Sequence, residues 1–365
     1  MSIDLRNVNS FLIFSLFLSV ILADIVIFSS FEYFNFIYVG LALIIIVFNY
    51  KKIKIDFYSL VLITPTIFFS LLSVIASKNL HTGGYYTFLL SAIILILFSV
   101  YNFRVNELFL NRILFIFYII ILIGSLIAIN FLPLSFLVDK KAGIFINSNV
   151  FGFHLVFFLI YFLIHFKSQK LKFITVLFSL PLLIHSNSRG AFLCFFIFLS
   201  LYITVFNFKS INIKLLKIFA YTFLLFSFLF LMYFNFENNE FVQKVISSGT
   251  TGRTDIWKVV ISKIFSSFDQ FIFGSGPATL NLNGFSAHNS YLNETSNMGV
   301  LYVLSYMTLI LYKGIKFYFK KYFVFIVVLF PLLFLGFFES ILFTNSILWT
   351  LLLYLSISFK KIYNK

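Results

Sequence analysis

Long apolar runs, each followed by a short polar connection, recur along the chain from one end to the other. A run of about 15 to 20 residues is long enough to cross a ~30 Å hydrocarbon core as a helix. The pattern predicts an all-α, polytopic membrane fold of about twelve transmembrane helices, with residues 1–365 forming a single membrane domain. The predicted spans cover residues 11–29, 34–50, 57–76, 87–101, 113–132, 150–166, 173–184, 191–206, 218–235, 298–312, 323–340 and 342–358.

One connection is much longer than the others, because residues 236–297 separate two predicted spans. Loops of that length in a compact protein are usually either functional or disordered. Aromatic and apolar residues occur throughout this one, which favours an ordered loop. The apolar residues from Trp257 to Phe268 follow helical spacing, so we expect an amphipathic helix near residues 254–268, capped by Thr254 and lying along the membrane face.

Composition supports the membrane assignment. Hydrophobic residues make up 61% of the chain and charged residues 11%, more apolar side chain than a water-soluble core needs. The formal net charge of +15 would suggest nucleic acid only if the basic residues gathered on one soluble face. They sit instead in short clusters between the apolar runs, so we expect a lipid bilayer as partner and no nucleic acid.

The basic clusters also predict the topology, since Lys and Arg accumulate in cytoplasmic loops. With a cytoplasmic N-terminus, most of the 27 Lys and Arg residues fall on the cytoplasmic side, although the longest loop is on the other. We therefore expect both termini in the cytoplasm, a first span that is retained rather than cleaved, and an extracytoplasmic (periplasmic) loop over residues 236–297. Cys194, the single cysteine, lies in an apolar run and supports neither a disulfide framework nor a thiol metal site.

Three polar segments fall on the predicted external side: HSNSRG (residues 185–190), GTTGRTDIW (residues 249–257) and SAHNSYLNETSNMG (residues 286–299). The guanidinium of Arg189 stands at the outer end of a span, where it must be solvated, paired or bound to an anion. Arg253 is placed at the start of the amphipathic helix, whose free backbone amides suit an anion. The alternatives are an interfacial Arg189 that reaches lipid headgroups and a solvated Arg253 on a packed loop helix.

His288 is the histidine best placed for chemistry. It precedes Asn289, Tyr291 and Glu294 in a polar segment that returns to the membrane, and a histidine can accept the proton of a sugar hydroxyl. A loop-bonded or capping role is the alternative. Most of the other histidines are interpreted as structural.

Acidic residues add two weaker candidates. Asp24 lies inside the first predicted span and Glu339 near the external end of a late one, and acids at membrane depth are functional candidates by default. Each could serve in a proton relay or sit at the interface. The sequence has no DxD-type carboxylate pair, HExxH motif or Cys/His cluster, so no metal or other cofactor is expected.

Together the SRG turn, the GRTDIW segment followed by FGSGP, and the HNSYL segment resemble the O-antigen ligase/polymerase family, over roughly residues 144–298. The resemblance implies an architecture like that of GT-C glycosyltransferases in a bacterial plasma membrane. It implies an inverting, metal-independent glycosyltransferase that takes a glycan from an undecaprenyl-diphosphate carrier on the external face. By matching position, Arg189 and Arg253 would contact the diphosphate, and His288 would activate the acceptor.

The resemblance leaves the acceptor open. A polymerase would extend another lipid-linked repeat unit into O-antigen or capsule-type polysaccharide, with a chain-length regulator as a further candidate partner, whereas an O-antigen ligase would transfer to lipid A-core or another acceptor. The modest external loop favours the polymerase. A transporter of the lipid-linked oligosaccharide is a second alternative, although it predicts internal repeats and polar residues along a central cavity. We expect Asn289, Tyr291 and Glu294 to bind sugar or diphosphate beside the three catalytic candidates.

Overall fold

The computed structural model describes residues 5–25, 34–53, 55–77, 80–99, 103, 105–131, 140–207, 253–276, 287–319 and 323–337. Within these ranges the regular structure is helical, apart from one isolated antiparallel bridge between Ile25 and Phe145. The longer described helices are α1 (Leu5–Ala23), α2 (Phe34–Phe48), α3 (Phe57–Ala76), α4 (Leu80–Ser99), α5 (Glu107–Phe131), α6 (Ser148–His165), α7 (Gln169–His185), α8 (Arg189–Asn207), α15 (Val300–Phe319) and α16 (Phe323–Leu335). Three shorter described helices are α11 (Arg253–Ile264), α12 (Phe268–Phe273) and α14 (Ser290–Met298).

Helices occupy most of each predicted span that falls within the described residues, although α1, α2 and α16 end before the predicted limits, at Ala23, Phe48 and Leu335. The prediction for α3 matches at both ends, whereas α5 begins six residues before the apolar run that predicted it. A polar first turn explains this difference, because the Asn106 side chain accepts a hydrogen bond from the Phe109 amide (3.3 Å) and caps the helix ahead of the apolar run. The predicted spans at residues 218–235 and 342–358 lie outside the described residues.

Four of the described helices, α1, α3, α5 and α6, are long and apolar enough to cross a membrane, and α2, α8 and α15 contain shorter apolar stretches. The outward face of α5 shows what surrounds the bundle. Ile116, Ile120, Ile123 and Ile127 follow one another at helical spacing and are 48–61% exposed. Such a continuous apolar surface is stable against lipid rather than water, so the chain is a helical membrane protein.

Helices α3 and α15 pack together in opposite directions, and hydrogen bonds mark both ends of their contact. At one end the Ser73 hydroxyl donates to the Asn297 carbonyl (3.1 Å), just before α15 begins. At the other end the Tyr312 hydroxyl donates to the Asp56 carboxylate (3.4 Å), which also caps α3 through the Ser59 amide (3.0 Å). The pair therefore defines two ends of the bundle, which we call the α14 end and the Asp56 end.

One of the basic clusters that predicted the topology, Lys51 and Lys52, lies at the Asp56 end. Asn49, at the end of α2, exchanges side-chain hydrogen bonds with Asn9 near the start of α1 (2.9 and 3.2 Å). Lys51 and Lys52 follow directly, and only a few residues separate them from Asp56. Loops rich in Lys sit on the cytoplasmic side of membrane proteins, so under the topology predicted from the sequence the Asp56 end is the cytoplasmic end and the α14 end is the external one.

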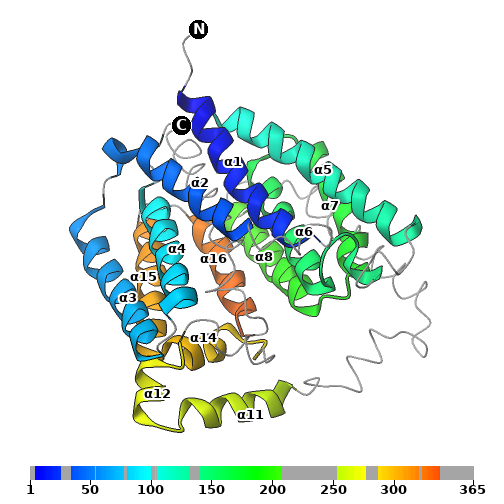
Figure 1. The fold of residues 1–365 in the computed structure, drawn as a ribbon. Helices are drawn as coiled ribbons and strands as arrows, with labels where there is room; N and C mark the ends of the chain where they lie inside the picture. The colour runs from blue at the N-terminus through cyan, green and yellow to red at the C-terminus, as the bar shows by residue number, and fades with distance from the viewer. Residues whose placement is uncertain are drawn as a thin grey trace.

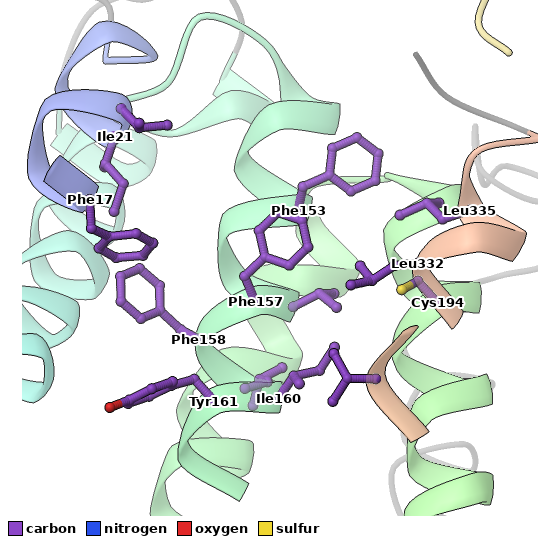
Figure 2. Packing of buried hydrophobic residues seen from close by; sticks show 14 of the residues in the cluster. Phe17, Ile21, Phe153, Phe157, Phe158, Ile160, Tyr161, Cys194, Leu332 and Leu335 are labelled. Atoms are coloured by element: carbon purple, nitrogen blue, oxygen red, sulfur yellow. The ribbon is translucent and has the colours of Figure 1, made fainter. Parts of the chain in front are cut away.

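Helix α6 is the centre of the apolar core. Every residue from Phe151 to Leu163 is buried, because α6 packs on α7, α8 and the other members of one large hydrophobic cluster. Phe158 meets Phe17 of α1 edge to face, with ring centroids 5.5 Å apart. On its other side Phe153 and the neighbouring side chains approach α16 and α8 (Figure 2). The central helix thus packs directly on α7 and α8, whose connection carries the first polar segment.

Candidate functional site

Helices α11 and α14 lie across the α14 end of the bundle, roughly transverse to α3, α15 and α16, and the short helix α12 lies beside them (Figure 1). Two of the three polar segments that the sequence analysis singled out belong to this layer. The third segment is the turn between α7 and α8.

His288 stands at the entry to α14 in an unusual backbone conformation. Its φ is +45°, the left-handed region that few non-glycine residues adopt, and its side chain is half-buried. On one side the Ala287 carbonyl accepts a hydrogen bond from Trp257 Nε1 of α11 (2.7 Å). On the other side Asn289 caps α14, since its side chain accepts from the Leu292 amide (3.1 Å). Bonds to both neighbours hold the backbone of His288 in place.

The first turn of α14 is attached to the end of α16. The Ser290 amide donates to the Gly336 carbonyl (2.7 Å), and the Tyr291 hydroxyl donates to the Leu333 carbonyl (2.8 Å). The Tyr291 ring also packs on Phe337, with centroids 4.6 Å apart. Burial raises the pKa of Tyr291 to about 12, so the hydroxyl keeps its proton at neutral pH. Tyr291, predicted to bind substrate, therefore has its donor committed to α16.

The last turn of α14 is held by the turn that follows α12. The Ser275 amide donates to the Ser296 carbonyl (2.9 Å) and the Gly276 amide to the Asn297 carbonyl (2.7 Å). Gly274, with φ +74°, comes so close that a Cβ on it would stand 2.3 Å from the Asn297 carbonyl oxygen. Only glycine fits there. Residues 274–276 of the FGSGP motif thus form the surface on which the last turn of α14 packs.

Arg189 is the first residue of α8, and its side chain is half-buried. The preceding residues form a tight turn, in which Asn187 has φ +55° and the Ser188 hydroxyl accepts from the Ala191 amide (3.4 Å). Helix α6 presses on this turn, because a Cβ at Gly152 would lie 2.6 Å from the Ser188 Cβ. Close packing of this kind fixes where the Arg189 backbone begins α8.

The Arg189 turn and the entry to α14 occupy the same end of the bundle. Helix α16 packs along α8, and Figure 2 shows Cys194 of α8 beside Leu332 of α16, with Leu335 further toward the end that carries Gly336. Cys194 is less than two turns from Arg189. The structure therefore brings the SRG turn toward the residues that receive α14.

Arg253 is the first residue of α11, and the structure describes its backbone only. It precedes Trp257 by one helical turn, about 6 Å, and Trp257 contacts the carbonyl beside His288. The starts of α11 and α14 are thus neighbours. Because α11 begins at Arg253, Thr254 lies inside the first turn, and its prediction as the N-cap is wrong.

Sequence reasoning missed the inward face of α14. Asn293, Ser296 and Asn297 are fully buried and Glu294 is 2% exposed. Burial raises the pKa of Glu294 to about 8, and the adjacent Asn293 side chain opposes that rise. Polar residues repeating at helical spacing in the NETSN segment are the available signal, but the sequence analysis describes this segment only as a polar stretch that returns to the membrane. Glu294 was expected to bind substrate, and the structure places it in the interior.

Chemically, the α14 end combines a positioned histidine, two helix starts that carry arginine and a layer of polar side chains. Helix N-termini and arginine together favour a phosphate ligand, and a half-buried histidine can take a proton. No protein-family model matches this chain, and no curated protein matches it.

Proposed function

We propose that this protein is an extracytoplasmic polymerase that joins undecaprenyl-diphosphate-linked oligosaccharide repeat units into a surface polysaccharide. The observation that carries the proposal is the attachment of the His288 segment between Trp257 of α11 and Gly336 at the end of α16. That attachment brings the starts of α11 and α14 together at the end that also holds the Arg189 turn.

The surface of α11 and α12 fits a site that receives a lipid-linked donor. Val259, Ile261, Phe265 and Phe268 are 41–76% exposed. Apolar side chains on a short helix at the end of a membrane bundle fit the boundary between headgroups and acyl chains. A carrier lipid could enter there with its chain in the bilayer and its diphosphate at the polar layer.

In the proposed reaction the diphosphate of the donor binds to Arg189 and Arg253, whose guanidinium groups present fixed forks of donors to phosphate oxygens. The acceptor hydroxyl attacks C1 of the donor sugar and gives its proton to the imidazole of His288. The new bond between the acceptor oxygen and C1 forms as the bond between C1 and the phosphate oxygen breaks. The lipid diphosphate leaves with the bonding electrons, and the anomeric configuration inverts.

The test is extension of lipid-linked repeat units by purified protein in vesicles, with product length followed on a gel. His288→Asn is the sharpest variant, because asparagine tolerates the left-handed backbone of residue 288 and cannot act as a base. Arg189→Gln and Arg253→Gln remove the guanidinium groups that are proposed to bind the diphosphate. We expect each to reduce extension by at least about 100-fold, the usual scale for loss of a general base, as at His288, and for loss of a group that stabilises developing charge, as at the two arginines.

Matched controls come from the same end of the bundle. His185→Gln changes an exposed histidine beside the Arg189 turn, and Lys258→Ala removes an exposed cation from α11. Both should extend chains normally. Normal extension by His288→Asn and the two arginine variants would refute the assigned site. Transfer to lipid A-core in place of chain extension would identify the ligase reaction at the same residues.

A further inference from the structure

The inward face of α14 is polar, at a position where a helix packed on a bundle normally presents apolar side chains. Glu294 Oε1, both amide atoms of Asn293 and Ser296 Oγ are buried and make no hydrogen bond of normal length and angle within the described part of the chain, although the Asn293 side chain is near enough to Glu294 to favour the ionised carboxylate. Buried polar atoms are almost always paired, since an unpaired one costs about 1–3 kcal/mol. Several together within about one turn of a helix indicate that something else satisfies them.

The charge of the Glu294 carboxylate limits which ligand could satisfy these buried polar atoms. Glu294 is a buried carboxyl, and the described residues include no Lys or Arg that forms an ion pair with it. A buried carboxylate is stable only when it is paired, protonated or bound to a cation. One carboxylate balances one positive charge, so a divalent ion would leave an uncompensated charge in the interior.

Burial limits the size of the ligand. A side chain that is 2% exposed is accessible to an ion or to water but not to a sugar ring. The available ligand atoms are hard oxygens from a carboxylate, a side-chain amide and a hydroxyl, which suit an alkali or alkaline-earth cation rather than a transition metal.

The arrangement of α14 keeps these atoms in place. Asn293 and Ser296 are one turn apart, as are Glu294 and Asn297, so the four side chains share one side of the helix. The Ser296 carbonyl accepts from Ser275 and Gln270, and the Asn297 carbonyl from Gly276 and Ser73. The backbone of this turn is therefore tied to α12 and α3 independently of its side chains.

We propose that Glu294, with Asn293 and Ser296, binds one monovalent alkali cation such as Na⁺ in the interior of the α14 end. The ion would neutralise the carboxylate and hold α14 against α3 and α15. This site is separate from the proposed glycan chemistry, and its test requires no glycan.

The experiment uses the full-length protein in detergent at pH 8.5, with thermal unfolding measured in choline chloride, NaCl and KCl at one ionic strength. Because a ligand that binds only the folded state raises Tm, we expect an increase of at least about 2 °C in NaCl or KCl over choline chloride. Equilibrium binding of radioactive ²²Na⁺ should reach one ion per chain in NaCl.

Glu294→Gln should abolish both the Tm increase and ²²Na⁺ binding. Asp269→Asn, which changes an exposed acid on the adjoining α12, should retain both. If Glu294→Gln fails to fold, the wild-type binding measurement and Glu294→Asp, which keeps the charge, decide the question. Equal Tm in all three salts with no bound ²²Na⁺ would overturn the proposal, and so would a Tm increase in CaCl₂ alone. If Tm is equal in all three salts, no ²²Na⁺ binds and Tm depends only on pH, Glu294 holds a proton in place of the cation.

Discussion

Asp24 Oδ2 lies 2.9 Å from Nε2 of His154, and this pair joins the end of α1 to the first half of α6. His154 is 1% exposed and stacks on Phe145, with ring centroids 4.8 Å apart. The Asp24 carbonyl also accepts from the Ile146 amide (3.0 Å). Through its carboxylate and its backbone carbonyl, Asp24 therefore connects two segments that are about 120 residues apart in sequence.

The first prediction concerns this pair. His154→Ala should lower stability by about 2–4 kcal/mol, because it leaves a cavity beside Phe145 and removes the partner of a part-buried carboxylate. Asp24→Asn, which keeps an acceptor for the imidazole, should cost about 1 kcal/mol. Thermal unfolding in detergent measures both. A structural pair predicts that Asp24→Asn extends glycans normally. Lost extension at unchanged Tm would instead support a proton-relay role for Asp24.

The second prediction concerns Gly274 and Gly299, the two glycines at which the backbones next to α12 and α14 come closest. Gly274→Ala and Gly299→Ala should each disrupt the contact between α12 and α14, since the new Cβ would stand 2.3 Å from the Asn297 carbonyl oxygen or 2.0 Å from the Ile272 carbonyl oxygen. Both glycines also have positive φ. We expect a loss of several kcal/mol, seen as a lower Tm or a lower yield of folded protein.

Gly40→Ala is the matched control for the glycine variants. A Cβ at Gly40, in the middle of α2, meets nothing within 4 Å, and alanine favours a helix by up to about 1 kcal/mol over glycine. Tm should therefore stay constant or rise. A Gly274→Ala protein as stable as Gly40→Ala would show that α14 does not depend on the close approach of the two backbones.

The third prediction separates two roles for Tyr291. Tyr291→Phe removes the hydrogen bond to the Leu333 carbonyl but keeps the ring contact with Phe337, so stability should fall by about 1 kcal/mol. If the hydroxyl serves only to hold α14, the KM for the lipid-linked unit should change little. A tenfold higher KM at unchanged Tm would contradict that role and place the hydroxyl on the substrate. Tyr58→Phe, at a 70% exposed tyrosine, is the control.

Much of the bundle could be predicted from hydropathy, and much of the α14 layer could not. A span such as α3 is predicted at both ends because Asp56 caps it and an apolar run fills it. In contrast, α14 has nine residues and is mostly polar, so it has no apolar period to detect. Its conformation depends on contacts with Gly336, Gly276 and Ser73, which lie 20 to more than 200 residues away in sequence.

The same limit applies to the candidate site. Arg189 and His288 could be selected because polar residues between apolar runs are conspicuous, and the positive φ of His288 follows no sequence rule. The sequence marks Asp24 only as an intramembrane acid and His154 only as a structural histidine, because their pairing across α1 and α6 can be seen only in the folded protein.

The amphipathic helix is predicted over residues 254–268, whereas in the structure α11 ends at Ile264 and α12 begins at Phe268. Ser267 causes the break, since its hydroxyl caps α12 through the Gln270 amide (3.1 Å).

The last prediction is a pH dependence of stability that originates at Glu294. Burial raises its pKa to about 8 from the ordinary 4.5, so between these values the folded protein holds a proton that the unfolded chain has released. Stability from this group is therefore greatest below pH 4.5, declines as pH rises toward 8, and is constant above that. In choline chloride, Tm should fall between pH 6 and pH 8 and then level off.

Glu294→Gln isolates this effect, because the difference in Tm between wild type and variant cancels the other titrating groups. Among the described residues, Tyr302 and Tyr306 of α15 are the titratable side chains that interact with Glu294, and Tyr291 of α14 interacts with Tyr306. Tyrosines ionise near pH 10 or above and contribute nothing between pH 6 and 8. Adding NaCl should reduce the slope, since a cation that replaces the proton keeps the carboxylate compensated as pH rises. A wild-type protein whose Tm follows that of Glu294→Gln from pH 6 to pH 9 in choline chloride would show that Glu294 is ionised or exposed, and that α14 is held by its backbone contacts alone.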